Sequence, residues 1–357
     1  MELTTTIVFF AVAFGLALCA MPIIIKIAKQ LNYVEENNER KLHTEKVSSF
    51  GGIGILAAFV GAILLVMKPG LDSPVMVFAL AIPLFALSLM DDVFHIGVTI
   101  RFVVQALMGL ALYEMGFQIL LFDGFWFLNL GATTLFIMLM INAFNLIDGI
   151  NGLAGGFGLI GSVVFGTLLA NHGSYELALA CFAYAGAMLG FLGFNFGKKA
   201  RIFMGDNGST VLGFFMAVMV LGIFKAEGTS DDVFSSSAWL VVLAVVSVPM
   251  ADVFKVMTFR MAHFRSPFSP DRTHIHHLFT DGLLSHPMAC AIMHGWTLLL
   301  VGIAIYFPLV FTVTTIIIAA MGPYTLAYSL RILGNTLASR ELDKTADGVS
   351  ADTVASQ

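Results

Sequence analysis

Long apolar runs alternate with short polar loops along the chain. Eleven of these runs approach or exceed the roughly 17–25 residues that a helix needs to cross a bilayer. They lie at residues 4–25, 50–67, 75–90, 102–121, 127–147, 152–170, 176–196, 209–224, 238–258, 288–307 and 310–332. The pattern therefore predicts an all-α, polytopic membrane bundle of about eleven transmembrane helices.

The composition agrees with a membrane protein. Hydrophobic residues make up 58% of the 357 residues, charged residues make up only 11%, and the mean hydropathy is +0.91. Such values exclude a water-soluble globular domain of this length. Because no linker divides the apolar runs, we expect one transmembrane domain over residues 1–335. The polar, small-residue-rich segment at 336–357 is expected to be a disordered tail.

Positive charge is distributed unevenly between the two sides of the predicted bundle. When the loops are assigned to alternating sides, only Lys68 and Lys225 of the 18 Lys and Arg residues fall on one of them. Lys and Arg concentrate in the cytoplasmic loops of membrane proteins. The pattern predicts a periplasmic N-terminus, a cytoplasmic C-terminus and an odd number of spans. No positive charge precedes the first run, so we expect it to be a retained span.

The predicted inner loop EENNERKLHTEKVSSFGGIG at 35–54 is basic and ends in glycines. One interpretation is an ordinary cytoplasmic loop that carries the positive-inside charge. The other is a phosphate-binding segment. In that case Arg40, Lys41 and His43 would meet the phosphate, and the glycines would let a helix start close to it.

Two adjacent carboxylates, Asp91 and Asp92, follow an apolar run and lie at a predicted membrane boundary. Each costs on the order of 2.5–3.5 kcal/mol when it enters the hydrocarbon, so the pair can be a solvated helix end. The alternative is a chemical role. One of the crowded carboxylates could accept a proton from a substrate phosphate, or lie close to a metal ion.

The segment NAFNLIDGING at 142–152 places two amides and a carboxylate at the end of a span. On a continuous helix, Asn145, Asp148 and Asn151 would be spaced i, i+3, i+6 and share one face. Such a face can ligate a metal and hydrogen-bond a nucleotide. The alternative is packing, with the Asn residues bonding between helices and the glycines forming a close seam.

The segment KKARIFMGDNGS at 198–209 combines basic residues with a single carboxylate. Lys198, Lys199 and Arg201 supply positive charge of the kind that a diphosphate needs. Asp206 is a candidate ligand for a hard cation such as Mg²⁺, which takes only one or two carboxylates from a protein. The alternative is helix capping at the start of the next span.

The segment HFRSPFSPDRTHIHH at 263–277 crowds basic and imidazole side chains together after two prolines that keep its start non-helical. Arg272, His274, His276 and His277 are candidates for clamping a phosphate. A zinc site is the alternative. It is disfavoured because no Cys or further His at ligand spacing accompanies these histidines.

Four motifs in this order resemble those of the polyprenyl-phosphate N-acetylhexosamine-1-phosphate transferase superfamily. They are DD at 91–92, NAFNLIDGINGL at 142–153, FMGDNGST at 203–210 and SPFSPDRTHIHH at 266–277. The similarity covers roughly residues 20–335. The last motif is most similar to bacterial undecaprenyl-phosphate GlcNAc-1-phosphate transferases, which initiate common-antigen, O-antigen or teichoic-acid linkage synthesis.

The resemblance implies a catalytic domain that transfers GlcNAc-1-phosphate from UDP-GlcNAc to undecaprenyl phosphate and releases UMP. It implies a multi-pass protein of the bacterial inner membrane with Mg²⁺ as cofactor, Mn²⁺ being the alternative. The expected partners are the two substrates and the lipid bilayer. No nucleic-acid partner is expected, and a homodimer stays open.

By the same resemblance, each candidate residue receives a role. Asp206 and Asn145 are assigned to the metal, and Asp91, Asp92 and Asp148 to catalysis. The nucleotide or diphosphate is assigned to Asn151, Arg201, Arg272, His274, His276 and His277. The lipid phosphate is assigned to Arg40, Lys41 and His43.

Two departures and two alternatives accompany the resemblance. Asn151 stands where most bacterial members have a second Asp, which favours hydrogen bonding to the nucleotide over a role as a base. The stretch EENNERKLH lacks the Pro of the related DxPNxRKxH pattern. Another UDP-N-acetylhexosamine or UDP-MurNAc-pentapeptide is the alternative donor, although enzymes of the latter group have a triple-histidine loop. A secondary transporter is disfavoured, because its site would lie near the bilayer midplane between inverted repeats.

Overall fold

The computed structural model describes residues 2–31, 47–94, 96–197, 199–227, 238–264, 274–280, 284–307 and 321–332. The predictions for Arg40, Lys41, His43, Arg272 and the tail at 336–357 lie outside these residues, as does the side chain of Asp92. Within the described ranges the chain forms helices and one isolated parallel bridge, between Ser48 and Ile202. The all-α prediction is confirmed.

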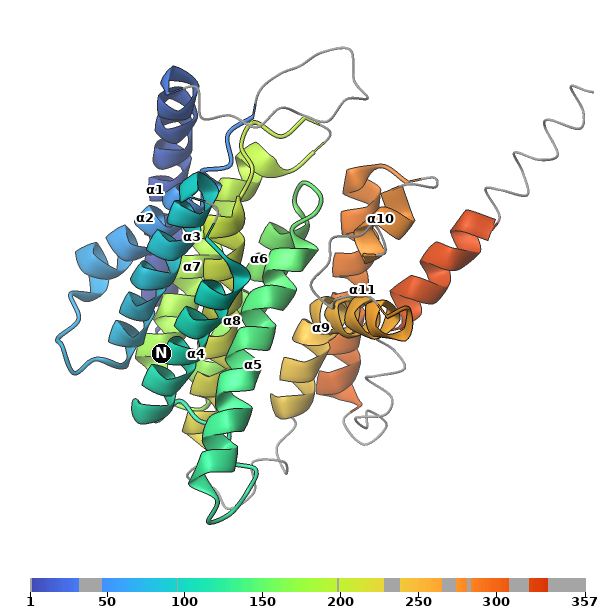
Figure 1. Ribbon diagram of the computed structural model, residues 1–357. Coiled ribbons are helices and arrows are strands. Elements are labelled where there is room, and N and C mark those ends of the chain that lie inside the picture. Colours follow the sequence, from blue (N-terminus) through green and yellow to red (C-terminus); the bar gives the residue numbers. More distant parts are fainter. Residues whose placement is uncertain are drawn as a thin grey trace, which may run out of the picture.

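The helices follow one another as the apolar runs predict (Figure 1). In chain order they are α1 (Leu3–Gln30), α2 (Gly51–Ala62), the π-helix η1 (Ile63–Met67), the 3₁₀-helix η2 (Pro74–Leu80), α3 (Ala81–Phe94), α4 (Val98–Glu114), α5 (Trp126–Ile147), α6 (Leu153–Asn171), α7 (Tyr175–Asn195), α8 (Asp206–Glu227), α9 (Ala238–Ala262), α10 (Ile275–Thr280) and α11 (His286–Tyr306). Residues 322–332 are helical as well.

Eight of the described segments are long and apolar enough to cross a membrane. They coincide with eight of the predicted runs to within a few residues. The apolar helix Gly51–Met67 is shorter. The prediction of a span at 102–121 extends too far. Helix α4 ends at Glu114, and Gly116 then takes a φ of +78°, which breaks the helix. The predicted count of about eleven spans is therefore not reached in the described part of the chain.

Helix α8 lies at the centre of the bundle. In its most apolar stretch of 18 residues, 83% of the residues are buried, against 22% in the corresponding stretch of α1 at the periphery. Aromatic rings join α8 to its neighbours: Phe215 stacks on Tyr184 of α7 at 3.9 Å between ring centroids and meets Phe59 of α2 edge-on at 4.6 Å. These contacts fix the central helix, whose first residue is Asp206.

Helix α9 changes direction along its length. It contains Pro249, which removes one backbone hydrogen bond and kinks a helix. In Figure 1 its first part runs along the bundle, beside α5, and its second part turns away towards α10 and α11. The second part contains Asp252 and Arg260, both of which are buried.

Small residues let α1 and α7 pack closely. A Cβ atom on Gly186 would lie only 2.2 Å from the carbonyl oxygen of Phe10 in α1. Close backbone approach across small residues is a principal source of helix association in membranes, where burial of apolar surface gives little driving force. The contact therefore depends on the absence of a side chain at position 186.

We expect Gly186→Ala to destabilise the bundle, because the added methyl group meets backbone that cannot move aside. Overpacking of this kind costs about 1–3 kcal/mol. The matched control is Gly193→Ala in the same helix, where a Cβ atom would meet nothing within 4 Å. Thermal unfolding of the purified protein should show a lower midpoint for Gly186→Ala only. Equal midpoints for the two variants would contradict the close α1–α7 contact.

Candidate functional site

The loop before α8 is held by the segment before α2, and this fixes Asp206. Gly205 has a φ of +75°, and a Cβ atom there would lie 2.0 Å from the carbonyl oxygen of Ser49. The backbone N–H of Gly51 donates to the carbonyl of Phe203 at 2.9 Å. Only glycine fits at position 205. Asp206 therefore opens α8 at a set place, as the first acidic residue of its first turn.

The prediction that Asn145, Asp148 and Asn151 share one helical face is wrong. Helix α5 ends at Ile147, and Asp148 leaves the helix with φ −76° and ψ 45°. The next residues form a turn, and Gly152 has a φ of +86° at the start of α6. A glycine in this left-handed conformation cannot continue a right-handed helix. The three polar residues thus belong to a helix end and a turn.

Asn151 anchors this turn. Its side-chain Nδ2 donates to the carbonyl of Gly197 at 3.1 Å, and the backbone N–H of Gly152 donates to Oδ1 of Asn195 at 2.7 Å. Both bonds tie the turn to the C-terminal end of α7. An Asp at position 151 could not donate to that carbonyl, which gives the Asn at this position a structural reason.

Asn145 and Asp206 face each other across α5 and α8. The amide Nδ2 of Asn145 donates to Oδ1 of Asp206 at 3.2 Å and to Oγ of Ser209 at 3.0 Å. Asp148 lies close enough to Asp206 to feel its charge. Burial, and then the negative charge of Asp206, raise the pKa of Asp148 well above its ordinary value. The structure thus brings together two carboxylates and one of the predicted amides.

The histidine segment packs directly on this turn. A Cβ atom on Gly149 would lie 2.0 Å from Nε2 of His276, so the ring packs directly against the glycine. Burial, and then the neighbouring His277, lower the pKa of His276 to about 3, so its imidazole is neutral near pH 7. Its buried Nδ1 has no hydrogen-bond partner in the structure. A ligand could supply one.

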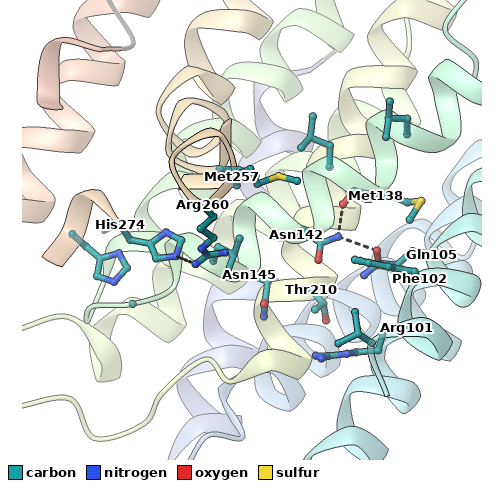
Figure 2. Close-up of a pocket in the computed structure, with 17 residues that line it drawn as sticks. Arg101, Phe102, Gln105, Met138, Asn142, Asn145, Thr210, Met257, Arg260 and His274 are labelled. Atoms are coloured by element: carbon teal, nitrogen blue, oxygen red, sulfur yellow. Dashed lines mark hydrogen bonds between the residues drawn. The ribbon is translucent and has the colours of Figure 1, made fainter. Parts of the chain in front are cut away.

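A pocket of about 560 Å³ opens beside these residues, between α4, α5, α9 and α10 (Figure 2). Most of its lining is apolar. The polar exceptions include Gln105 and Asn142, which bond to each other at 2.9 Å, and the side chains of Arg260 and His274. Asn145 and Thr210 also line the pocket (Figure 2). The largely apolar pocket therefore reaches Asn145, whose amide bonds to Asp206 of the acidic cluster, the pair Asp148 and Asp206.

Asp91 does not line this pocket but is paired with a residue that does. Its Oδ2 forms an ion pair with Nη1 of Arg101 at 3.0 Å, and Arg101 lines the pocket. Helix α3 is also joined to α8 by a hydrogen bond of 2.9 Å between the hydroxyls of Ser88 and Thr210. Asp91 is thus held next to the other polar residues.

Arg201 is not part of the same cluster. Its guanidinium lies over the ring of Phe194, 5.0 Å from the centroid, and it does not line the pocket.

His277 contacts the ring of His276, with 4.3 Å between centroids. Among the described candidates, Asn145, Asp148, Asp206, His274 and His276 are therefore brought together.

Sequence reasoning missed several polar residues of the pocket, and also Asp252, which does not line the pocket but bonds to His274. Arg101 and Arg260 entered it only as positive-inside charges. Gln105 and Asn142 lie in apolar runs, and Asp252 is a lone carboxylate within the run at 238–258. An ionisable residue inside a span is a signal for function in its own right. That signal could have found Asp252.

The sequence is similar to those of known proteins. Residues 74–224 match the sequence model of glycosyl transferase family 4. The chain is 34% identical over 265 residues to the undecaprenyl-phosphate alpha-N-acetylglucosaminyl 1-phosphate transferase of Yersinia pestis, covering 71% of each chain. The chain belongs to glycosyl transferase family 4.

Other relatives of this family 4 protein have similar names. The Escherichia coli K12 protein named undecaprenyl-phosphate alpha-N-acetylglucosaminyl 1-phosphate transferase is 33% identical over 267 residues, which cover 71% of this chain and 70% of the relative. A Bacillus subtilis protein named probable undecaprenyl-phosphate N-acetylglucosaminyl 1-phosphate transferase is 27% identical over 300 residues, 81% of each chain. The similarity thus extends beyond the matched family segment.

We expect the stability of this family 4 protein to fall as the pH rises through the raised pKa of Asp148. A raised pKa in the folded state means that folding favours the protonated carboxyl, so this contribution is complete below the unfolded value of about 3.8 and is lost above the folded value. In chelator-containing buffer, Asp148→Asn should reduce that loss. The control is Asp123→Asn, in the exposed loop at the other end of α5. Thermal midpoints that depend on pH identically in Asp148→Asn and the unmodified protein would contradict the crowded pair.

Proposed function

We propose that this chain transfers GlcNAc-1-phosphate from UDP-GlcNAc to undecaprenyl phosphate, giving undecaprenyl-diphosphate-GlcNAc and UMP. The observation that supports it best is the position of Asp148 and Asp206 beside a largely apolar pocket. A phosphate at the end of a long lipid needs both an apolar groove and a polar site at its mouth. The names of the relatives point to the same two substrates.

The pocket suits the acceptor. A volume of about 560 Å³ is typical of small-molecule sites and is too small for a whole undecaprenyl chain. We therefore place the phosphate and the nearest isoprene units in the pocket and the rest of the chain in the bilayer. Arg101 and Arg260 both line it, so two cations lie at the wall where the phosphate would bind.

The oxygen ligands that Asp148 and Asp206 offer fit one divalent cation of the Mg²⁺ type. Asp148 and Asp206 repel each other, and a cation between them would relieve that repulsion. The described residues contain no group of three or more His, Cys, Asp or Glu able to hold a metal. Mg²⁺ takes one or two carboxylates and completes its shell with water and phosphate oxygens, so two suffice. When bound, the ion would neutralise charge on the diphosphate.

Asn145 acts on this pair as a positioning residue. Its Nδ2 holds Oδ1 of Asp206 and the hydroxyl of Ser209, which leaves the second oxygen of Asp206 for a ligand. Because one amide nitrogen holds both groups, α5 and α8 stay in register at the site. Mn²⁺, which accepts the same oxygen ligands, is the alternative ion.

The reaction is a transfer between two phosphate esters. An oxygen of undecaprenyl phosphate attacks the β-phosphorus of UDP-GlcNAc, a new P–O bond forms, and the bond from that phosphorus to the oxygen of UMP breaks. The main obstacle is the approach of two anions. Arg101 and Arg260 reduce their repulsion, and neutral His276 can hydrogen-bond to the diphosphate through its unpartnered Nδ1.

The proposed setting is the bacterial inner membrane, with the site at the cytoplasmic face, where nucleotide sugars are made. The excess of Lys and Arg in the loops at that end supports this orientation. The product would be the first lipid-linked sugar of an envelope polysaccharide, such as O-antigen or common antigen.

Purified protein incubated with Mg²⁺, undecaprenyl phosphate and UDP-GlcNAc should release UMP and form a lipid-linked sugar. Asp206→Asn should lower kcat/KM by on the order of 100-fold or more, because it removes one of the two carboxylates that would hold the metal ion. The matched control, Asp123→Asn, lies in an exposed loop and should leave kcat/KM unchanged.

The donor is tested in parallel with UDP-GalNAc and UDP-MurNAc-pentapeptide. Product from one of these but not from UDP-GlcNAc would change the sugar and keep the reaction. Release of UMP from none of the three would reject the proposed function. Asp206→Asn with normal turnover at limiting Mg²⁺ would reject the metal assignment.

A further inference from the structure

Asp252 is a buried carboxylate that lies outside the acidic cluster. It sits in α9, its exposed fraction is 0%, and both of its oxygens are hydrogen-bonded. Oδ2 lies 2.8 Å from Nδ1 of His274. Oδ1 accepts from the backbone N–H of Ile275 at 2.8 Å and from the hydroxyl of Tyr324. One side chain thus joins α9, the start of α10 and the helix at 322–332.

These bonds determine which nitrogen of His274 holds the proton. A carboxylate only accepts, so Nδ1 of His274 must be the donor. The other nitrogen, Nε2, faces Nη2 of Arg260 at 3.5 Å, the long end of hydrogen-bonding distance (Figure 2). A guanidinium only donates, so Nε2 is the acceptor. The geometry points to neutral His274 with its proton on Nδ1.

Asp252 is connected to the pocket through His274, although Asp252 itself does not line it. His274 and Arg260 line the pocket, whereas Asp252 does not. The exposed fractions of His274 and Arg260 are only 6% and 3%, so neither side chain has much room to reorient. Whatever fixes the ring of His274 therefore also fixes one of the groups that the Arg260 guanidinium contacts.

We propose that Asp252 is a positioning residue for the transfer reaction: it fixes the ring and tautomer of His274, and through them the guanidinium of Arg260 at the pocket wall. This role rests on the proposed function, because the phosphate groups of the substrates are what Arg260 would meet. A purely structural role is the alternative, in which Asp252 only ties α9 to the helix at 322–332.

Asp252→Asn distinguishes the positioning role from the purely structural role. It keeps the size of the side chain and changes one hydrogen-bond acceptor to a donor. The Asn oxygen can still accept from Ile275 and Tyr324, while its NH₂ group faces Nδ1 of His274. His274 must then move its proton to Nε2, where it meets the donor Arg260. Partners that orient a metal-bound histidine typically change affinity or activity 10- to 100-fold, and we expect an effect near the lower end of that range for a histidine that acts through an arginine.

We expect Asp252→Asn to raise the KM for undecaprenyl phosphate, the substrate whose phosphate Arg260 would meet, by on the order of 10-fold. KM does not depend on how much of the protein is folded. The matched control is Tyr324→Phe, which removes one donor to Asp252 and leaves its bond to His274. It should change KM by less than about twofold. An unchanged KM and kcat in Asp252→Asn would overturn the proposal, and so would an equal rise in KM in Tyr324→Phe.

A second measurement applies even if Asp252→Asn does not fold. Solid-state NMR of the unmodified protein with ¹⁵N-labelled histidine reports which ring nitrogen is protonated, and His274→Asn identifies the signals by their loss. We expect a protonated Nδ1 and an unprotonated Nε2 for His274; a proton on Nε2 would overturn the proposal. This readout needs no turnover, so a protein that transfers no sugar would defeat the proposed function and leave the tautomer testable.

Discussion

Asp148 and Asp206 approach each other at the meeting point of two helix ends, and the site depends on that approach. Helix α5 stops one residue before Asp148, and α8 starts at Asp206 because the Gly205 backbone lies against the Ser49 carbonyl. Like charges in a half-buried setting reduce stability, as the raised pKa of Asp148 indicates. A fold that keeps such a pair gives up stability at a place where a cation and phosphates can use the charge.

The membrane sets the second constraint. Charged groups are costly in hydrocarbon, so the acidic pair lies at helix ends, while the pocket beside it is largely apolar and continues along α4, α5 and α9. A substrate with a charged head and a long apolar tail meets both environments at once. The kink in α9 adds a third element, because the part beyond Pro249 carries Arg260 to the pocket wall and Asp252 to the histidine segment.

The lengths of the apolar runs predicted the helices well, since eight described spans coincide with such runs. The site was predicted less completely. Asn145, Asp148, Asp206 and His276 come together as the motifs suggested, but the shared helical face failed at Gly152, whose positive φ is a backbone property. Asp252 was missed because its partners, His274 and Tyr324, are 22 and 72 residues away. Pairings at such separations depend on how helices pack, which one sequence does not reveal.

The central claim is that a sugar phosphate, and not the sugar alone, moves to the lipid. Following radioactive phosphorus placed at the β-position of UDP-GlcNAc tests this most directly. Transfer of GlcNAc-1-phosphate breaks the bond between the two phosphates, so the label should appear in the lipid product while unlabelled UMP is released. A label that stays in the nucleotide as UDP while GlcNAc reaches the lipid would contradict the account. The bond that breaks would then join the sugar to the β-phosphate, and not the two phosphates to each other.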